Sequence, residues 1–399
     1  MIIIRSSSSS SRRAAQLFRS ATHPKKFSYI EQLTNYLKNN VIVHEPDITS
    51  FQLFIPGRFI IIPKPYGISC VGVRQQQSGV FEDSVFDRKD SDTESLKNIA
   101  DDCVTISDCI PGLSRLFSEP NLSFCTGLKS KLVSERFIIF FCFLFYRYLS
   151  GAIVLPANKI DFENMKKSIQ HVTGKPANCP YHYRSLAILI SSPPTTLGTI
   201  SGYATFQSNG HQSEYIFVEK YAKKRARTGK FAVAGSMDWR VLVERNGCSL
   251  VEFGVNKFAR HLPRVMFSHM LCPILGDEIY GNRLIEIDGK PATVQPKDLR
   301  RVQHQRYFPP AVPQLLGVSQ PDLIKAMPIY CHVYSTIFPR FGWILGRPKG
   351  QQDVADLYAN APPPPHFLAM VEALGMNKAL MEFFHDDEEA KIIAGDKKF

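Results

Sequence analysis

The chain lacks the cysteine patterns that indicate a metal centre or a disulfide framework. Its nine cysteines are odd in number, and they include no C-x-x-C pair. Free thiols in a reducing compartment fit this usage better than a secreted, disulfide-bonded domain. The sequence therefore gives no indication of a metal site.

Long apolar runs and internal repeats are also absent. The apolar run at residues 137–146 has ten residues, whereas a membrane-spanning helix needs about 20. No secretory signal with a small-residue cleavage site opens the chain. We therefore expect no membrane partner.

Acidic residues are missing from the first thirty positions, because the first acid is Glu31. Six serines in a row occupy residues 6–11, and six cations are scattered through the segment: Arg5, Arg12, Arg13, Arg19, Lys25 and Lys26. Basic, serine-rich and acid-free leaders are typical of mitochondrial transit peptides. We expect residues 1–45 to be a transit peptide and leader that directs the protein to the mitochondrial matrix. The alternative is an unprocessed, disordered basic tail. The net charge of +12 suggests a polyanionic partner, and this segment carries half of it.

The most informative stretch that the chain does contain runs over residues 261–281. Arg264 begins an apolar run, and Met266, Met270 and Leu271 have helical spacing, which predicts a short amphipathic helix that Pro273 ends. Gly276 and Asp277 then favour a tight turn, since glycine tolerates positive φ and aspartate bonds nearby amides. An arginine on such a helix requires an anionic partner, because burial of its charge alone is costly.

This stretch resembles the late motif of the RluA-type RNA pseudouridine synthases, which reads roughly HQIRVH, a spacer, and PILGD..YG. The matching residues are His261, Arg264, Pro273, Ile274, Leu275, Gly276, Asp277, Tyr280 and Gly281. Leu262-Pro263 replaces Gln-Ile, and Phe258-Ala259 replaces the usual Gly-Arg. In style, the chain is most similar to the mitochondrial mRNA pseudouridine synthases.

Two earlier segments resemble the same family in the same order. A β-branched run at residues 51–62 predicts a strand, and Lys64-Pro65-Tyr66-Gly67 after it matches the family's KPxG turn. Residues 149–155, LSGAIVL, resemble the family's TSGLLLL strand, which follows the catalytic loop. The resemblance covers roughly residues 51–285.

The resemblance places a catalytic aspartate five residues before Gly151, where this chain has Tyr146. Residues 137–147 are the anomalous segment, with five phenylalanines and neither strand alternation nor helical period. We expect them to be either a fully buried strand or the translation of a retained intron. The intron is an alternative because codons for the flanking residues can contain the dinucleotides found at splice sites. Without this segment, Glu135 falls at the catalytic spacing. Glu135 is otherwise a surface glutamate.

Residues 183–190 predict a strand that resembles the family's KxYLA strand, followed by a turn at Gly198-Thr199-Ile200. The family tyrosine corresponds to Ser185, and Tyr183, two residues earlier on the same face, is the candidate substitute. Residues 240–252 alternate around Asn246-Gly247, which predicts a β-hairpin.

Six cations in eleven residues form the strongest basic run outside the leader: Lys220, Lys223, Lys224, Arg225, Arg227 and Lys230. We expect them to contact RNA phosphates, with a merely solvated face as the alternative. Lys64 and His261 join them as candidate RNA contacts through the resemblance. The acidic insert at residues 82–102 is expected to be a solvated loop away from the substrate.

The resemblance implies an α+β fold at residues 46–346, with a mixed, mainly antiparallel central sheet, flanking helices and an RNA-binding cleft. Residues 347–399 are expected to form a linker, a helix that docks through Phe367, Met370, Val371 and Leu374, and a mobile tail.

The implied reaction flips a uridine out of its stack, breaks its glycosidic bond and rejoins the base through carbon. A carboxylate is the nucleophile or base, and Arg264 would hold that carboxylate ionised. Neither a metal nor an organic cofactor is implied, and the partner is mitochondrial mRNA or rRNA. The alternative is an RNA-binding protein of the same fold without catalysis. A carboxylate beside Arg264 at the base of the cleft would discriminate between the two.

Overall fold

The computed structural model describes residues 7–44, 59–70, 104–123, 148–174, 181–208, 213–220, 232–288, 290–294, 307–339, 341 and 357–385. The helices in these ranges are α1 (Ser7–Thr22), α2 (Ile30–Asn39), α5 (Ile106–Phe117), α6 (Lys159–Gly174), η2 (Ala259–His261), α8 (Leu262–His269), α9 (Glu278–Gly281), α10 (Ala311–Leu316), α11 (Gln320–Ala326) and α12 (Pro365–Ala373). The strands are β1 (Val43–His44), β2 (Phe59–Lys64), β3 (Ser150–Pro156), β4 (Tyr183–Ile190), β5 (Leu197–Ser208), β6 (Ser213–Val218), β7 (Ala232–Arg245), β8 (Cys248–Val255), β9 (Leu284–Ile287), β10 (Lys290–Thr293), β11 (Cys331–Phe338) and β12 (Leu357–Asn360).

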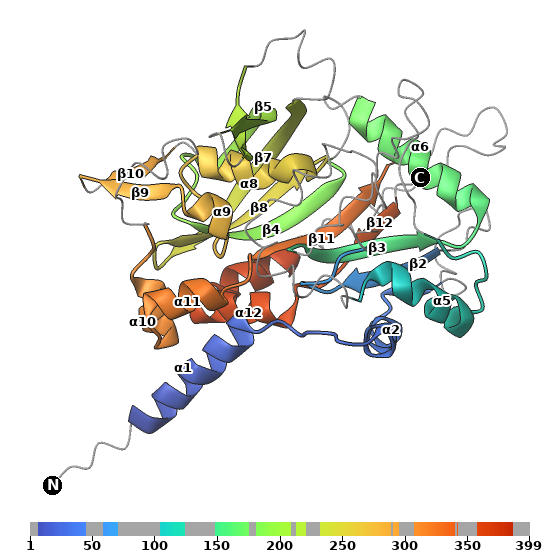
Figure 1. Cartoon of the computed structure of the whole chain (residues 1–399), viewed down its shortest axis with the longest axis horizontal. Helices are drawn as coiled ribbons and strands as arrows, with labels where there is room; N and C mark the ends of the chain where they lie inside the picture. Colours follow the sequence, from blue (N-terminus) through green and yellow to red (C-terminus); the bar gives the residue numbers. More distant parts are fainter. Residues whose placement is uncertain are drawn as a thin grey trace.

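One twisted sheet of ten described strands forms the centre of the molecule (Figure 1). Its order is β1-β2-β3-β11-β4-β8-β7-β5-β6, and β12 pairs with β11 outside this path. The β3–β11 pair is parallel, and the other described pairs are antiparallel. The expected α+β fold with a mixed, mainly antiparallel central sheet and flanking helices is confirmed.

The sheet has helices on both faces, because successive side chains of a strand point to opposite sides. On one face, α2 and α5 pack over β2 and α8 packs over β5–β7, in a single apolar core. The opposite face carries α1, α10, α11 and α12 in a second core and α6 in a third. We call the face that bears α8 the front face and the other the back face.

The hairpin between β7 and β8 follows from two residues with positive φ. Asn246 has φ 55° and Gly247 has φ 75°, the combination that a type I′ turn requires and that Asn-Gly favours. The turn places Arg245 opposite Cys248. The hairpin expected at residues 240–252 is present, and the strand expected at residues 183–190 is β4.

Two local expectations need correction. Gly198 lies inside β5, paired with Trp239, and not in a turn. A Cβ at Gly198 would lie 2.2 Å from Cζ2 of Trp239, so the glycine makes room for the indole ring. Helix α8 ends at His269, and Leu271 has φ 63°, so Met270 and Leu271 lie beyond the helix that they were expected to extend.

Both terminal segments pack on the domain. Leu33 and Leu37 of α2 are fully buried in the front core, so the packed part of the chain begins before residue 46. Helix α1 packs against α12 and α10, and the Tyr330 hydroxyl donates to the carbonyl of Ala21 at 3.0 Å. The helix after the polyproline run is α12, which buries Phe367, Met370, Val371 and Leu374. Strand β12, in the segment expected to be a linker, extends the sheet. None of the described helices is long and apolar enough to cross a membrane.

Candidate functional site

Arg264 is buried on α8 and pairs with a buried carboxylate. Its Nε donates to Oδ2 of Asp277 at 2.7 Å, and its Nη2 donates to Oδ1 at 2.8 Å. Burial alone would lower the pKa of Arg264, but the charge and hydrogen bonds of Asp277 raise it well above its usual value. Bidentate arginine–carboxylate pairs are strong and fix their geometry. Arg264 therefore has the anionic partner that its position requires.

Asp277 is held in place by the helix that it begins. Its Oδ1 also accepts from the backbone N–H of Ile279 at 3.1 Å and of Tyr280 at 3.0 Å, which caps α9. Gly276 precedes it with φ 84°. The side chain is fully buried. The turn expected at Gly276-Asp277 thus orients the carboxylate toward Arg264.

Aromatic rings surround this ion pair. The Arg264 guanidinium lies 5.0 Å from the ring centroid of Tyr280 and 4.5 Å from that of Tyr148. The Tyr280 hydroxyl forms a 2.9 Å hydrogen bond with Nδ1 of His261. We call Tyr148, His261, Arg264, Asp277 and Tyr280 the Arg264 cluster.

The cluster meets the other two sequence motifs. Tyr148 is the first described residue after the segment 124–147, which includes the expected catalytic loop. Leu149, next in the chain, accepts a hydrogen bond through its carbonyl from Nζ of Lys64 in the KPYG turn. Segments around residues 64, 148 and 264 therefore converge on the front face. Tyr148 was not anticipated, and its place directly before the LSG motif was the signal that could have identified it.

Two residues that were expected to contact RNA have buried side chains in the described structure. Lys64 is 1% exposed and donates to the carbonyls of Pro65 and Leu149. Its side chain lies on the front-face side of β2, where its ammonium donates hydrogen bonds to backbone carbonyls. His261 is also buried, and burial together with the charges of Arg264 and Arg283 lowers its pKa well below its usual value. A neutral, buried imidazole offers RNA neither a charge nor a reachable donor.

Tyr183 and Ser185 both lie on the front-face side of β4. Tyr183 is buried, with its ring 4.2 Å from the His182 ring and 5.5 Å from the Phe258 ring between centroids. Ser185 is fully buried opposite Val333 and Phe253, and its hydroxyl has no hydrogen-bond partner among the described residues. Tyr183 therefore packs in the core beside the position that the resemblance gives to tyrosine.

Several candidate residues lie outside the described ranges. They are Glu135, Lys223, Lys224, Arg225, Arg227, Lys230, the acidic insert at 82–102 and the apolar insert at 137–147. Lys220 is described and exposed at the end of the β6 segment.

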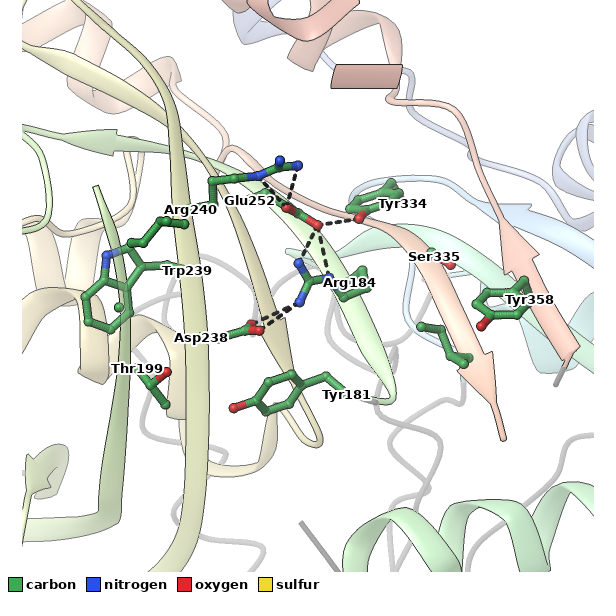
Figure 2. A pocket seen from close by; sticks show the side chains of 13 residues that line it. Tyr181, Arg184, Thr199, Asp238, Trp239, Arg240, Glu252, Tyr334, Ser335 and Tyr358 are labelled. Atoms are coloured by element: carbon green, nitrogen blue, oxygen red, sulfur yellow. Dashed lines mark hydrogen bonds and ion pairs between the residues drawn. The ribbon is translucent and has the colours of Figure 1, made fainter. Parts of the chain in front are cut away.

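The back face carries a cavity of about 810 Å³ that the sequence did not indicate (Figure 2). Arg184 forms ion pairs with Asp238 at 3.0 Å and with Glu252 at 2.5 Å. Glu252 also accepts from Arg240 at 3.2 Å and from the Tyr334 hydroxyl at 2.6 Å. Two cations and two anions thus satisfy one another across β4, β7 and β8, and the Tyr334 hydroxyl adds β11. Arg184 points away from the Arg264 cluster because it alternates with Tyr183 and Ser185 along β4.

The described residues include no group of three or more histidine, cysteine, aspartate or glutamate side chains placed to hold a metal ion. The five described cysteines are buried, and burial raises the pKa of Cys70 and of Cys248 to about 12. Such thiols stay protonated near neutral pH and are poor nucleophiles.

No family model matches this chain, and no curated protein matches its sequence. Two human solved structures resemble its fold. The first, RNA pseudouridylate synthase domain containing 4, has a TM-score of 0.49 at 16% identity, with 86% of this chain and 96% of that chain covered. The second, RNA pseudouridylate synthase domain containing 1, has a TM-score of 0.41 at 14% identity, with 87% and 90% covered.

Proposed function

We propose that this chain is a form of an RluA-type RNA pseudouridine synthase that acts on mitochondrial RNA, and that residues 137–147 keep the 399-residue form inactive. The observation that carries the proposal is the convergence of three motif segments, distant in sequence, on the Arg264 cluster. Lys64 binds the carbonyl of Leu149, and Tyr148 lies against Arg264. Tyr148, the first described residue after the segment in which the reaction needs a carboxylate, therefore lies beside the buried arginine.

The chemistry conserves the atoms of the substrate. The N1–C1′ bond of uridine breaks, a C5–C1′ bond forms, the C5 proton leaves and N1 gains a proton. A base must be flipped out of its stack for these atoms to be reached. Glu135 is the proposed nucleophile or base, and the Arg264–Asp277 pair is the proposed support for it. The exposed Lys220 and the rest of the basic run to Lys230 are proposed to bind phosphates.

A second candidate function is RNA binding without catalysis. The observation in its favour is that Asp277 already occupies Nε and Nη2 of Arg264. A cation neutralised by one carboxylate does less to hold a second one ionised. In the chain as it stands, Tyr146 occupies the catalytic spacing. A phenol has a pKa of about 10, so it is not ionised near neutral pH and does not replace a carboxylate.

Tritium release from RNA that contains C5-tritiated uridine separates the two functions. The full 399-residue chain is expected to bind RNA and release no tritium, whereas a form that lacks residues 137–147 is expected to release it. Release by the full chain would refute the assignment of the catalytic spacing to Tyr146. Inactivity of both forms, with RNA binding intact, would favour the second function.

A further inference from the structure

We infer that residues 25–40 form a second contact surface for single-stranded RNA, which we call the α2 groove. The inference rests on the proposed function for the identity of the nucleic acid. It concerns a segment that the sequence assigned to the leader, and it applies to the chain that retains residues 25–40. No part of the basic run at residues 220–230 belongs to it.

The groove has a volume of about 520 Å³, and basic, carboxamide and aromatic side chains line it. Its polar lining consists of Lys25, Lys26, Gln32, Asn35, Asn39 and Asn40. None of its described lining residues is acidic. Glu31, the one acid of α2, does not line it.

Two aromatic rings lie at the base of the groove. Phe27 and Tyr36 pack with ring centroids 5.0 Å apart, and Nζ of Lys25 lies 4.9 Å from the Tyr36 ring and 5.4 Å from the Phe27 ring. The rings therefore position the ammonium, and the half-buried Tyr36 ring offers π surface beside it. Cations next to aromatic faces are the common design of sites for single-stranded nucleic acids.

The carboxamides select RNA over a lipid surface as the partner. Asn35 and Asn39 present a donor and an acceptor together, which matches the edges of unpaired bases. By contrast, Asn40 also donates to the carbonyl of Tyr36, and Gln32 accepts from the N–H of Ser28. An anionic membrane would be bound by charge and inserted apolar groups, and carboxamides contribute neither.

Helix α2, which carries the groove, packs on the same sheet face as the Arg264 cluster. Leu33 and Leu37 of α2 are fully buried in the front core, which α8 also enters. The chain between Lys25 and Asn40 is thus fixed to the domain that carries the site. RNA that extends from the cluster across the front face would meet α2 on the opposite half of the sheet.

The test measures binding of the full chain to a fluorescein-labelled, unstructured 20-nucleotide RNA over a range of salt concentrations. In the Lys25→Ala/Lys26→Ala variant, the log–log salt slope should fall by about 1.4, since each phosphate contact on a single strand contributes about 0.7. The affinity should fall roughly 25-fold at about 0.1 M salt. The Asn35→Ala/Asn39→Ala variant should bind more weakly with an unchanged slope, because it removes no cation.

The charge-matched control is Lys159→Ala/Lys325→Ala, which removes two exposed lysines outside residues 25–40. It should leave the slope within about 0.3 of the parent value. An equal loss in the control, or no RNA binding by the parent, would overturn the inference. So would binding through Lys25 and Lys26 to vesicles with anionic lipid but not to RNA. Tritium release is measured separately on the form that lacks residues 137–147, so binding through the groove together with inactivity of that form refutes the proposed activity alone.

Discussion

At the scale of single residues, the fold depends on charged and imidazole side chains that are buried away from water. Arg264 and Asp277 are both buried and satisfy each other. Breaking a buried ion pair from one side is far more costly than breaking an exposed one, because the remaining charge stays without water. Burial likewise favours the neutral form of the buried histidines, because a charged imidazole would also be without water.

We predict that Asp277→Asn lowers the free energy of unfolding by about 3–5 kcal/mol. The amide cannot neutralise Arg264, although it still offers an acceptor to α9. Denaturant unfolding of the purified chain measures the effect. Glu372→Gln is the matched control, because it breaks the exposed Arg13–Glu372 pair at 3.1 Å and should cost less than about 1 kcal/mol. Equal costs would show that the Arg264–Asp277 pair is not effectively desolvated.

Stability should fall as the pH drops from about 6.5 to about 4. Burial lowers the pKa of His182, His332 and His366 to about 4. The unfolded chain binds a proton at each near pH 6.5 and the folded chain does not, so this contribution is complete above pH 6.5 and is lost on acidification. Unfolding free energies measured at pH steps of about half a unit give the slope.

In His182→Gln, the slope of the unfolding free energy against pH should decrease by up to the equivalent of one bound proton. A pH-independent unfolding free energy in the parent over this range would contradict the buried-histidine account.

At the scale of elements, the sequence predicts what is encoded locally. Strand β4 and the Asn246-Gly247 hairpin follow from alternation and from residues that accept positive φ. The capping role of Asp277 follows from the Gly276-Asp277 turn. Gly198 was misassigned because its role depends on Trp239, which lies 41 residues away (239 − 198). The burial of Lys64 was missed for a similar reason, since its partner is the carbonyl of Leu149.

Two glycines with similar backbone conformations should respond differently to alanine. Gly67 and Gly276 have φ of 83° and 84°, so both substitutions strain the backbone, at about 1–2 kcal/mol. A Cβ at Gly276 would also lie 1.8 Å from the backbone oxygen of Pro328, whereas one at Gly67 would have nothing within 4 Å. Gly276→Ala should therefore cost at least about 2 kcal/mol more. Similar unfolding free energies for the two variants would contradict the close approach of residues 276 and 328.

At the scale of the whole molecule, segments far apart in sequence are packed into one fold. The sequence predicted the sheet class. Helix α2 lies in the segment that the sequence assigned to the leader, yet it buries Leu33 and Leu37. Charge composition describes the exposed side of a helix, while packing depends on the few apolar residues of the other side.

We predict that residues 1–30, fused to a fluorescent reporter, direct the reporter into mitochondria. The six cations and the absence of acids are suited to import driven by the membrane potential. Confocal imaging with a matrix marker measures the outcome. A fusion with Arg5, Arg12, Arg13 and Arg19 replaced by glutamine should stay in the cytosol. Cytosolic localisation of the unaltered fusion would end the mitochondrial assignment.

The most direct test of the account is the tritium-release rate of three forms that lack residues 137–147. The parent carries Glu135, and the other two carry Glu135→Gln and Glu135→Asp. Glutamine has the same shape but cannot ionise or act as a nucleophile, so the account predicts no release above background. Aspartate keeps the ionised group, and the account predicts that this variant releases tritium. Release by Glu135→Gln at the parent rate would contradict the claim that a carboxylate delivered to the Arg264 cluster performs the reaction.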